Sequence, residues 1–245
     1  MTDGNYNPRL AFEKRRQARI KRLKIRRFAF CVLTVIITTL LIVGGVFIFK
    51  LIKGEIYDEG FIPGPYGKNV SEKVEKATEL ELPEWIDINL INKHGTARSG
   101  IYLTDIKNIV IHYVGNPGSS AKNNRDYFNK PTTTVSSHFV VGLEGEIIQC
   151  VPLYEKSAAS NNRNKDTISI EVCHPDESGK YNDSTYDSVV KLVSWLCHEF
   201  ELDRNDVIRH YDITGKICPK YYVEHEDAWE KLKEDIKESI KNYED

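Results

Sequence analysis

The sequence predicts an α/β or α+β domain that follows a single membrane-spanning helix. Three observations lead to this prediction. A basic segment occupies residues 1–27, an uncharged apolar run fills residues 28–49, and strand-like and helix-like segments alternate from Pro83 onward. The 245 residues, of which 40% are hydrophobic, suffice for one domain of ordinary size with additional segments.

The first segment is strongly basic. Residues 1–27 contain ten Lys or Arg and two acidic residues, a local charge of +8 in a chain whose net charge is −2. Such a flank directs the amino terminus to the cytoplasm, although Lys50 and Lys53 on the far side weaken the bias slightly. Clustered basic residues also bind nucleic-acid phosphates, but beside an apolar run they are explained more simply by topology and anionic lipid. We therefore predict a basic cytoplasmic tail and no nucleic-acid partner.

The apolar run at residues 28–49 is long enough to cross the hydrocarbon core of a bilayer as a helix. A secretory signal would have a shorter core and a small-residue cleavage site, and residues 50–55 offer none. A buried core helix is the alternative, but such a helix is rarely apolar on every face. We predict an uncleaved signal anchor in the cell membrane, with everything after about residue 50 outside the cytoplasm.

Residues 50–82 are polar and contain several Gly and Pro, which is typical of a linker, with a short helix possible over Ser71–Leu80. We place the domain itself at residues 83–245. Four of the five cysteines lie beyond the apolar run, and three would remain if Cys218 bound metal. That odd number argues against a framework of disulfides.

The first elements of the domain are marked by apolar runs and turn residues. Residues 108–114 predict a strand, and residues 117–120 predict a turn whose serine caps a helix that ends near Phe128. Residues 137–142 and 146–151 are rich in β-forming residues on either side of a glycine-containing turn, which predicts a hairpin.

Later elements follow from periodicity. A strand over residues 167–172 places Ile168, Ile170 and Val172 on one face and Glu171 on the other. A helix from Ser184 to Leu202 has apolar residues at three-and-four spacing, and Ser184 with Asp187 resembles a capping box. A last helix covers about residues 227–241, with Trp229, Leu232, Ile236 and Ile240 on one side.

Three residues form a candidate metal site. His112 lies near the end of a predicted strand, and His210 and Cys218 are eight residues apart in a loop that contains Gly215 and Pro219. Two imidazoles and one thiolate suit zinc with its fourth position open to water or substrate, an arrangement typical of catalysis. The spacing alone leaves another interpretation open, in which these residues are structural histidines and a buried thiol.

Five segments in order give a family resemblance: NIVIHYVGN, AKNNRDYFN, SSHFVVGLEGEIIQCVP, DTISIEVCHP and RHYDITGKICP. With these segments the chain from Pro83 onward resembles the type 2 family of N-acetylmuramoyl-L-alanine amidases, related in fold to peptidoglycan recognition proteins. The resemblance implies a mixed central β-sheet flanked by helices. It also implies Zn²⁺ held by His112, His210 and Cys218, and hydrolysis of the amide between N-acetylmuramic acid and L-alanine in peptidoglycan.

The resemblance implies catalytic residues as well. The family has a glutamate on the strand spelled ISIEVC here, so Glu171 is the candidate that takes a proton from the attacking water and passes it to the leaving amine. Lys216 is a candidate to stabilise the negative charge that develops on the carbonyl oxygen, although a solvated lysine is the alternative. Many members carry a Trp-His-Ala-Gly-like segment where this chain has residues 155–160, so contacts with substrate should differ there. A peptidoglycan-binding module without turnover, or an enzyme for another cell-wall substrate, therefore remains an alternative.

Two further polar residues allow two interpretations each. His138, in a predicted strand, is either a hydrogen-bonded structural histidine, which we favour, or a group of the cleft. Asp212, two residues after His210, either orients that imidazole or caps the loop.

Overall fold

The computed structural model describes residues 70–93 and 95–243. All of these residues belong to one compact unit. The predicted basic tail and apolar span, residues 1–27 and 28–49, lie outside the described residues. Within the described ranges, no helix is both long and apolar enough to cross a bilayer.

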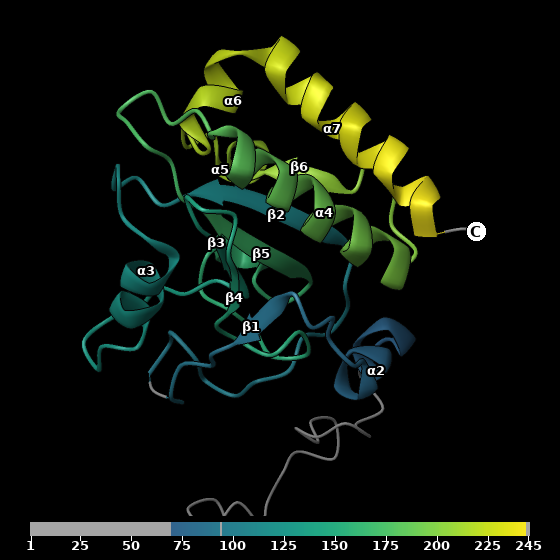
Figure 1. Ribbon diagram of the computed structural model, residues 1–245. Helices are drawn as coiled ribbons and strands as arrows, with labels where there is room; N and C mark the ends of the chain where they lie inside the picture. The colour runs from purple at the N-terminus through teal and green to yellow at the C-terminus, as the bar shows by residue number, and fades with distance from the viewer. Residues whose placement is uncertain (1–69, 94, 244–245) are drawn as a thin grey trace, which may run out of the picture. The chain divides into compact units, whose positions relative to one another are not determined.

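A central mixed sheet organises the domain (Figure 1). Its strands, in the spatial order β1-β4-β3-β5-β2-β6, are β1 (Ile86–Ile88), β4 (Ile147–Gln149), β3 (Phe139–Val141), β5 (Thr167–Val172), β2 (Asn108–Tyr113) and β6 (Val207–Arg209). The β3–β4 hairpin is antiparallel and every other neighbouring pair is parallel. The predicted strands at 108–114 and 167–172 and the predicted hairpin are therefore confirmed, as is the mixed sheet.

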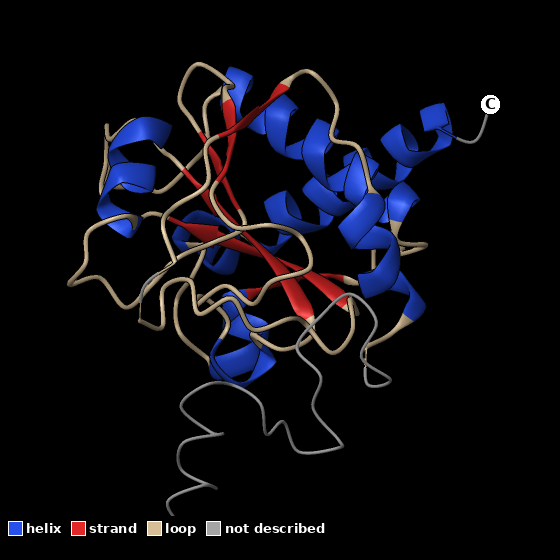
Figure 2. Ribbon diagram, turned by 90° about the horizontal axis from the view of Figure 1, so that it is seen from below, coloured by secondary structure: helices blue, strands red, loops and turns tan. Residues whose placement is uncertain are grey.

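Helices surround this sheet, and Figure 2 shows the strands at the centre of the domain with the helices outside them. The helices are α2 (Glu72–Glu79), α3 (Ala121–Phe128), α4 (Asp183–Glu199), α5 (His210–Thr214), α6 (Lys220–Glu224) and α7 (Glu226–Ile240), with short 3₁₀ turns η1 (Asn161–Arg163) and η2 (Lys241–Tyr243). The long helices α4 and α7 pack against each other along one face of the sheet (Figure 1).

The main core lies between that face and α4 and α7. Alternate residues of β5, namely Ile168, Ile170 and Val172, join the core cluster together with Trp229 and Leu232 of α7. The opposite face of the sheet carries a smaller apolar cluster that includes residues of α3. Since Glu171 belongs to the face turned away from the main core, the alternation predicted for residues 167–172 is confirmed.

Two helix starts can be compared with their predicted caps. Ser120 caps α3 by accepting a hydrogen bond from the backbone N–H of Asn123, as expected. The expected start of the long helix at Ser184 is wrong, because the side chain of Asn182 accepts from the backbone N–H of Thr185 and starts α4 at Asp183. The helix also ends earlier than expected, at Glu199 instead of residue 202, and Glu201 then adopts a left-handed backbone.

Helix α2 belongs to the folded domain. Its residues Val74 and Ala77, three positions apart on one face, are buried in the main core cluster, and Lys76 forms an ion pair with Glu199 at 3.0 Å. The domain boundary expected at residue 83 is therefore too late, since a segment assigned to the linker buries apolar side chains against the sheet and helices. The short helix that the sequence allowed over residues 71–80 is present.

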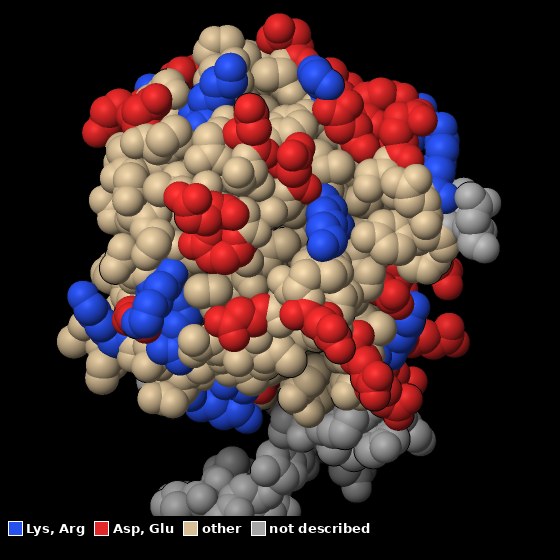
Figure 3. All heavy atoms as spheres, in the orientation of Figure 1, with Lys and Arg blue, Asp and Glu red and all other residues tan. Residues whose placement is uncertain are grey.

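Acidic side chains are prominent on the face that carries α4 and α7 (Figure 3). Exposed acidic residues of these helices include Asp183, Asp187, Glu226, Asp227 and Glu230.

Candidate metal centre

The site lies where three parallel neighbouring strands end. His112 is the fifth residue of the six-residue β2, and its register partner on β5 is Glu171. Strand β6 ends at Arg209 and leads directly into α5, whose first residue is His210. Because β5, β2 and β6 are adjacent and run in the same direction, their carboxyl ends bring these side chains to one edge of the sheet.

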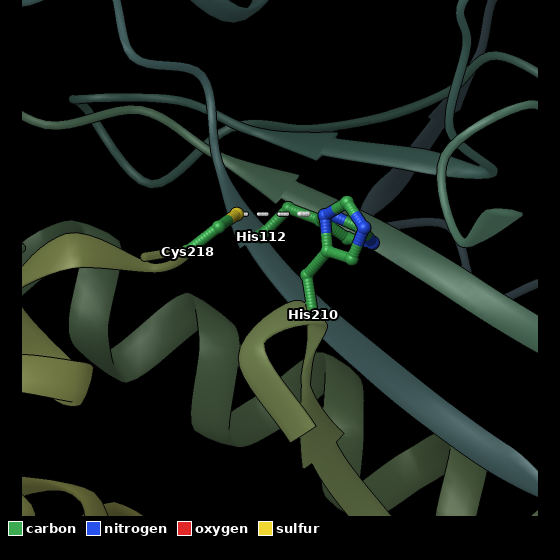
Figure 4. Close-up of side chains that lie close together, drawn as sticks. All are labelled: His112, His210 and Cys218. Carbon is green, nitrogen blue, oxygen red and sulfur yellow. Dashed lines mark hydrogen bonds between the residues drawn. The ribbon is translucent and has the colours of Figure 1, made fainter. Parts of the chain in front are cut away.

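Cys218 reaches the same place through a tight turn after α5. Gly215 ends that helix in the left-handed conformation, with φ of 76°, which glycine adopts without steric cost. The backbone N–H of Tyr211 donates to the carbonyl oxygen of Cys218 at 2.9 Å, which closes the loop. Figure 4 shows the three side chains of His112, His210 and Cys218 pointing toward one another. The structure therefore brings together the three predicted metal ligands.

The geometry and donor set of this cluster fit zinc. One ligand atom from each residue can be chosen so that all three lie within 4.8 Å of one another, and all three residues are buried. The Sγ of Cys218 is 3.8 Å from the Nδ1 of His112. Usual Zn–N and Zn–S bond lengths at a tetrahedral angle imply an N···S separation of about 3.6 Å. The buried Nδ1 of His210 has no hydrogen-bond partner, which leaves its lone pair available to a metal.

The Nε2 atoms of His112 and His210 contact two consecutive residues of a loop. The Nε2 of His112 is 3.4 Å from the Oγ of Ser160, and the Nε2 of His210 is 2.9 Å from the Oδ1 of Asn161. Sequence reasoning missed both residues, because they lie in a polar stretch that has no periodicity and reads as an ordinary loop.

Burial sets the protonation of the metal-free cluster. Burial lowers the pKa of His112 well below its usual value, and the nearby charges of His210 and Lys216 lower it further. Burial and Lys216 also lower the pKa of His210. Burial, helped by the neighbouring Glu171, raises the pKa of the Cys218 thiol to about 12, although the Tyr113 backbone N–H and Lys216 partly offset this effect. Without metal, the cluster at neutral pH thus holds two neutral imidazoles and a neutral thiol.

Glu171 and Lys216 both lie near the cluster, because the charges of both act on Cys218. The Oε2 of Glu171 is sheltered from solvent and has no hydrogen-bond partner. Burial raises the pKa of this carboxyl to about 8, and the positive charge of Lys216 offsets part of the rise. Lys216 is exposed on the loop between α5 and Cys218. A carboxyl group with an unpaired buried oxygen, beside three candidate metal ligands, is the arrangement expected of a group that exchanges protons with substrate or water.

Two adjoining hollows flank the cluster. A hollow of about 800 Å³ is lined by residues that include His210, Lys216, Ala158 and Ala159. A second hollow, of about 530 Å³, is lined by Glu171 and by residues of α3. Val135 lines both hollows, so the two adjoin at this residue. Ala158 and Ala159, which belong to the segment at residues 155–160 that departs from the family pattern, form part of the wall of the first hollow.

The other polar residues have structural contacts. His138 is fully buried, with Nδ1 3.2 Å from the Oγ of Ser169 and Nε2 2.8 Å from the carbonyl oxygen of Glu155, so the structural interpretation is confirmed. Asp212 accepts hydrogen bonds from the backbone and guanidinium of Arg209, and it therefore caps the start of α5 instead of orienting His210.

Taken together, the fold and the cluster define a class: an α/β domain with a three-ligand His/His/Cys centre, a neighbouring carboxylate and open hollows on both sides. Structural zinc sites are closed by four protein ligands, whereas three ligands leave a position for water or substrate. These are the features of metal-dependent hydrolases.

Residues 102–221 match the model of the family described as N-acetylmuramoyl-L-alanine amidase. Residues 102–221 therefore form a domain of the type 2 amidase family. The chain is 32% identical over 152 residues to the N-acetylmuramoyl-L-alanine amidase CwlL of Bacillus licheniformis, covering 55% of this chain and 42% of the relative. It is 31% identical over 168 residues to the amidase BlyA of Bacillus subtilis strain 168, covering 60% of this chain and 45% of the relative. The chain thus spans less than half the length of these relatives.

Solved structures support the assignment of the fold. A mutant endolysin from Bacillus subtilis aligns with a TM-score of 0.55 and 27% identity, covering 62% of this chain and 97% of that one. The catalytic domain of XlyA aligns with a TM-score of 0.54 and 26% identity, covering 62% of this chain and 98% of that one. The mixed sheet flanked by helices is therefore the fold of known type 2 amidase structures.

Proposed function

We propose that the chain is a zinc-dependent N-acetylmuramoyl-L-alanine amidase that hydrolyses the amide between N-acetylmuramic acid and L-alanine in peptidoglycan. The observation that carries the proposal is the complete His112, His210 and Cys218 cluster beside the partnerless carboxylate of Glu171, within a domain of this family. The names of the amidase relatives supply the bond and the polymer.

The residues divide the chemistry among them. A zinc ion held by His112, His210 and Cys218 would supply Lewis acidity, which polarises a carbonyl and acidifies water. Glu171 takes a proton from the attacking water and returns it to the leaving amine of L-alanine. Lys216 places a positive charge near the carbonyl oxygen, where negative charge develops as water adds.

The contending function is a peptidoglycan-binding module that has kept the fold and lost turnover. The altered segment at residues 155–160 favours it, because alanines line the hollow where the family resemblance implies a cleft histidine. The complete set of three candidate metal ligands favours the enzyme, because a module that only binds peptidoglycan does not require an open coordination position on a metal.

One experiment separates the two functions. Residues 70–245, which retain α2, and the full-length chain are incubated with purified peptidoglycan, with and without a zinc chelator, and released fragments are analysed by mass spectrometry. We expect stem peptides with a free L-alanine amino terminus, and we expect the chelator and Glu171→Gln to abolish their release. Binding of the polymer without release by the zinc-loaded wild type would refute the enzymatic proposal.

We further propose that residues 28–49 anchor the chain in the cell membrane and that the amidase domain is extracytoplasmic. The uncharged run and its basic flank support this topology. Protease added to intact protoplasts should digest the domain while residues 1–27 stay protected. Digestion of the domain only after lysis would refute the topology.

A further inference from the structure

Two consecutive residues of one loop, Ser160 and Asn161, contact the far nitrogens of both histidines in the cluster. The distances are 3.4 Å from the Nε2 of His112 to the Oγ of Ser160 and 2.9 Å from the Nε2 of His210 to the Oδ1 of Asn161. A carbonyl oxygen only accepts hydrogen bonds, so the Nε2 of His210 must carry the proton. The Nδ1 of that ring, buried and without a partner, is then left as the lone pair that faces the other ligands.

The loop is built to hold this position. Ser160 is fully buried, and the side-chain oxygen of Asn164 accepts from the backbone N–H groups of Ala159 and Ser160 at 3.1 and 2.6 Å. Asn161 itself has a left-handed backbone, with φ of 53°. Asparagine tolerates this conformation better than most residues, and it turns the chain so that neighbouring side chains reach two different rings. The turn η1, which starts at Asn161, is closed by a hydrogen bond from the backbone N–H of Asn164 to the carbonyl oxygen of Asn161.

We propose that Asn161, supported by Ser160, is a positioning residue that selects the tautomer of His210 and fixes its ring so that Nδ1 binds zinc. The proposal rests on the zinc site of the proposed function. It assigns a role to part of the segment in which this chain departs from its relatives. Partners of this kind orient metal-binding imidazoles, and their loss typically weakens metal affinity about 10- to 100-fold.

Zinc affinity of the full-length chain in detergent, measured by competition with a chromophoric chelator, tests the proposal directly. Asn161→Gly removes the amide and keeps a residue that adopts the left-handed backbone without strain, so it separates the side chain from the turn. We expect Asn161→Gly to bind zinc about 10- to 100-fold more weakly than the wild type. Asn161→Asp retains an acceptor and should bind zinc at least as tightly as the wild type. Asn162→Ala, at the exposed neighbouring position, is the matched control and should leave affinity unchanged.

Two readouts exclude a merely structural role. The absorption spectrum of the cobalt-loaded protein should change in Asn161→Gly and return to the wild-type shape in Asn161→Asp, because it reports ligand geometry. The melting temperature of the chelator-treated Asn161→Gly variant should match that of the chelator-treated wild type. Unchanged zinc affinity and an unchanged cobalt spectrum in Asn161→Gly would overturn the proposal, and so would equal weakening by Gly and Asp. Those results would leave the amidase proposal intact, which fails instead if the wild type binds no zinc or releases no stem peptide.

Discussion

Glu171→Gln gives the sharpest test of how burial acts on the candidate catalytic carboxyl. Glutamine has nearly the same shape but does not ionise, so the variant removes a titration and little packing. The test uses the metal-free protein, because the raised pKa of Glu171 arises from burial among uncharged ligands. In that state the folded chain holds the proton of Glu171 more tightly than the unfolded chain does.

The magnitude follows from the pKa of Glu171. A rise from 4.5 to about 8 corresponds to at most about 5 kcal/mol of differential stability. The sign is set by proton binding: between these two pKa values the folded chain keeps a proton that the unfolded chain has released. The free energy of unfolding of the wild type therefore decreases as pH rises through this window, and it is fully retained below the lower value. The glutamine variant lacks this decrease.

The assay is urea unfolding of the chelator-treated wild type and Glu171→Gln, in the presence of a reductant, from about pH 5 to about pH 8.5. We expect the variant to gain about 4 kcal/mol relative to the wild type across this range, since the range covers most of the titration. Glu144→Gln, on the exposed hairpin turn, is the matched control and should keep the wild-type slope. Parallel curves for the wild type and Glu171→Gln would refute the inference that burial controls this carboxyl.

Four other tests separate metal binding, catalysis and stability. Cys218→Ala should abolish stoichiometric zinc binding, and full zinc content by elemental analysis would contradict the ligand assignment. Because burial raises the pKa of the Cys218 thiol to about 12, zinc must displace a proton from this thiol when it binds. The apparent zinc affinity, measured by titration calorimetry, should therefore increase about tenfold per pH unit between about pH 7 and 9. An affinity that does not change with pH would refute this expectation. Lys216→Ala should lower kcat about 10- to 100-fold with zinc content unchanged, whereas normal turnover would show that the lysine is only solvated. Arg209→Met should lower the free energy of unfolding in urea by about 2 kcal/mol, because the guanidinium of Arg209 donates to Asp212, Glu226 and the carbonyl oxygen of Tyr222. The control Arg204→Met, which removes an ion pair at the surface, should lower it by less than about 1 kcal/mol.

Sequence patterns predicted the elements whose apolar periodicity is strong. The alternation in residues 167–172 and the three-and-four spacing in α4 and α7 each reflect burial against the main core, and the structure confirms them. Helix α2 was assigned to the linker because charged residues dominate its composition. Only Val74 and Ala77 of that helix are buried, and two residues three apart give too little periodicity to predict packing against a core. The start of α4 was misplaced because Asn182 and Ser184 are both good caps, and the choice depends on which side chain meets a free backbone N–H.

Part of the candidate site could likewise be predicted from the sequence, and part could not. The three candidate ligands could be singled out because their residue types are unusual donors and because the surrounding segments resemble a family, and the structure places them together. The residues that flank His112 and Cys218 in the sequence do not reveal that the Nδ1 of His112 and the Sγ of Cys218 lie 3.8 Å apart. This proximity requires β2 to pair with β6 and the chain to turn back at Gly215. Ser160 and Asn161 could not be predicted, because their role depends on which ring nitrogen they meet.

The structure also explains why the altered segment at residues 155–160 is compatible with a metal site. The alanines at 158 and 159 line a hollow, where a substitution changes what substrate touches. The polar residues that follow them contact ring nitrogens, where a substitution changes how the ligands are held. Because these two roles fall on different residues, substrate contacts can change in this segment while the metal ligands keep their orientation. Variants at Ala158 or Ala159 should therefore alter turnover or substrate choice with normal zinc content, whereas variants at Asn161 should alter zinc affinity itself.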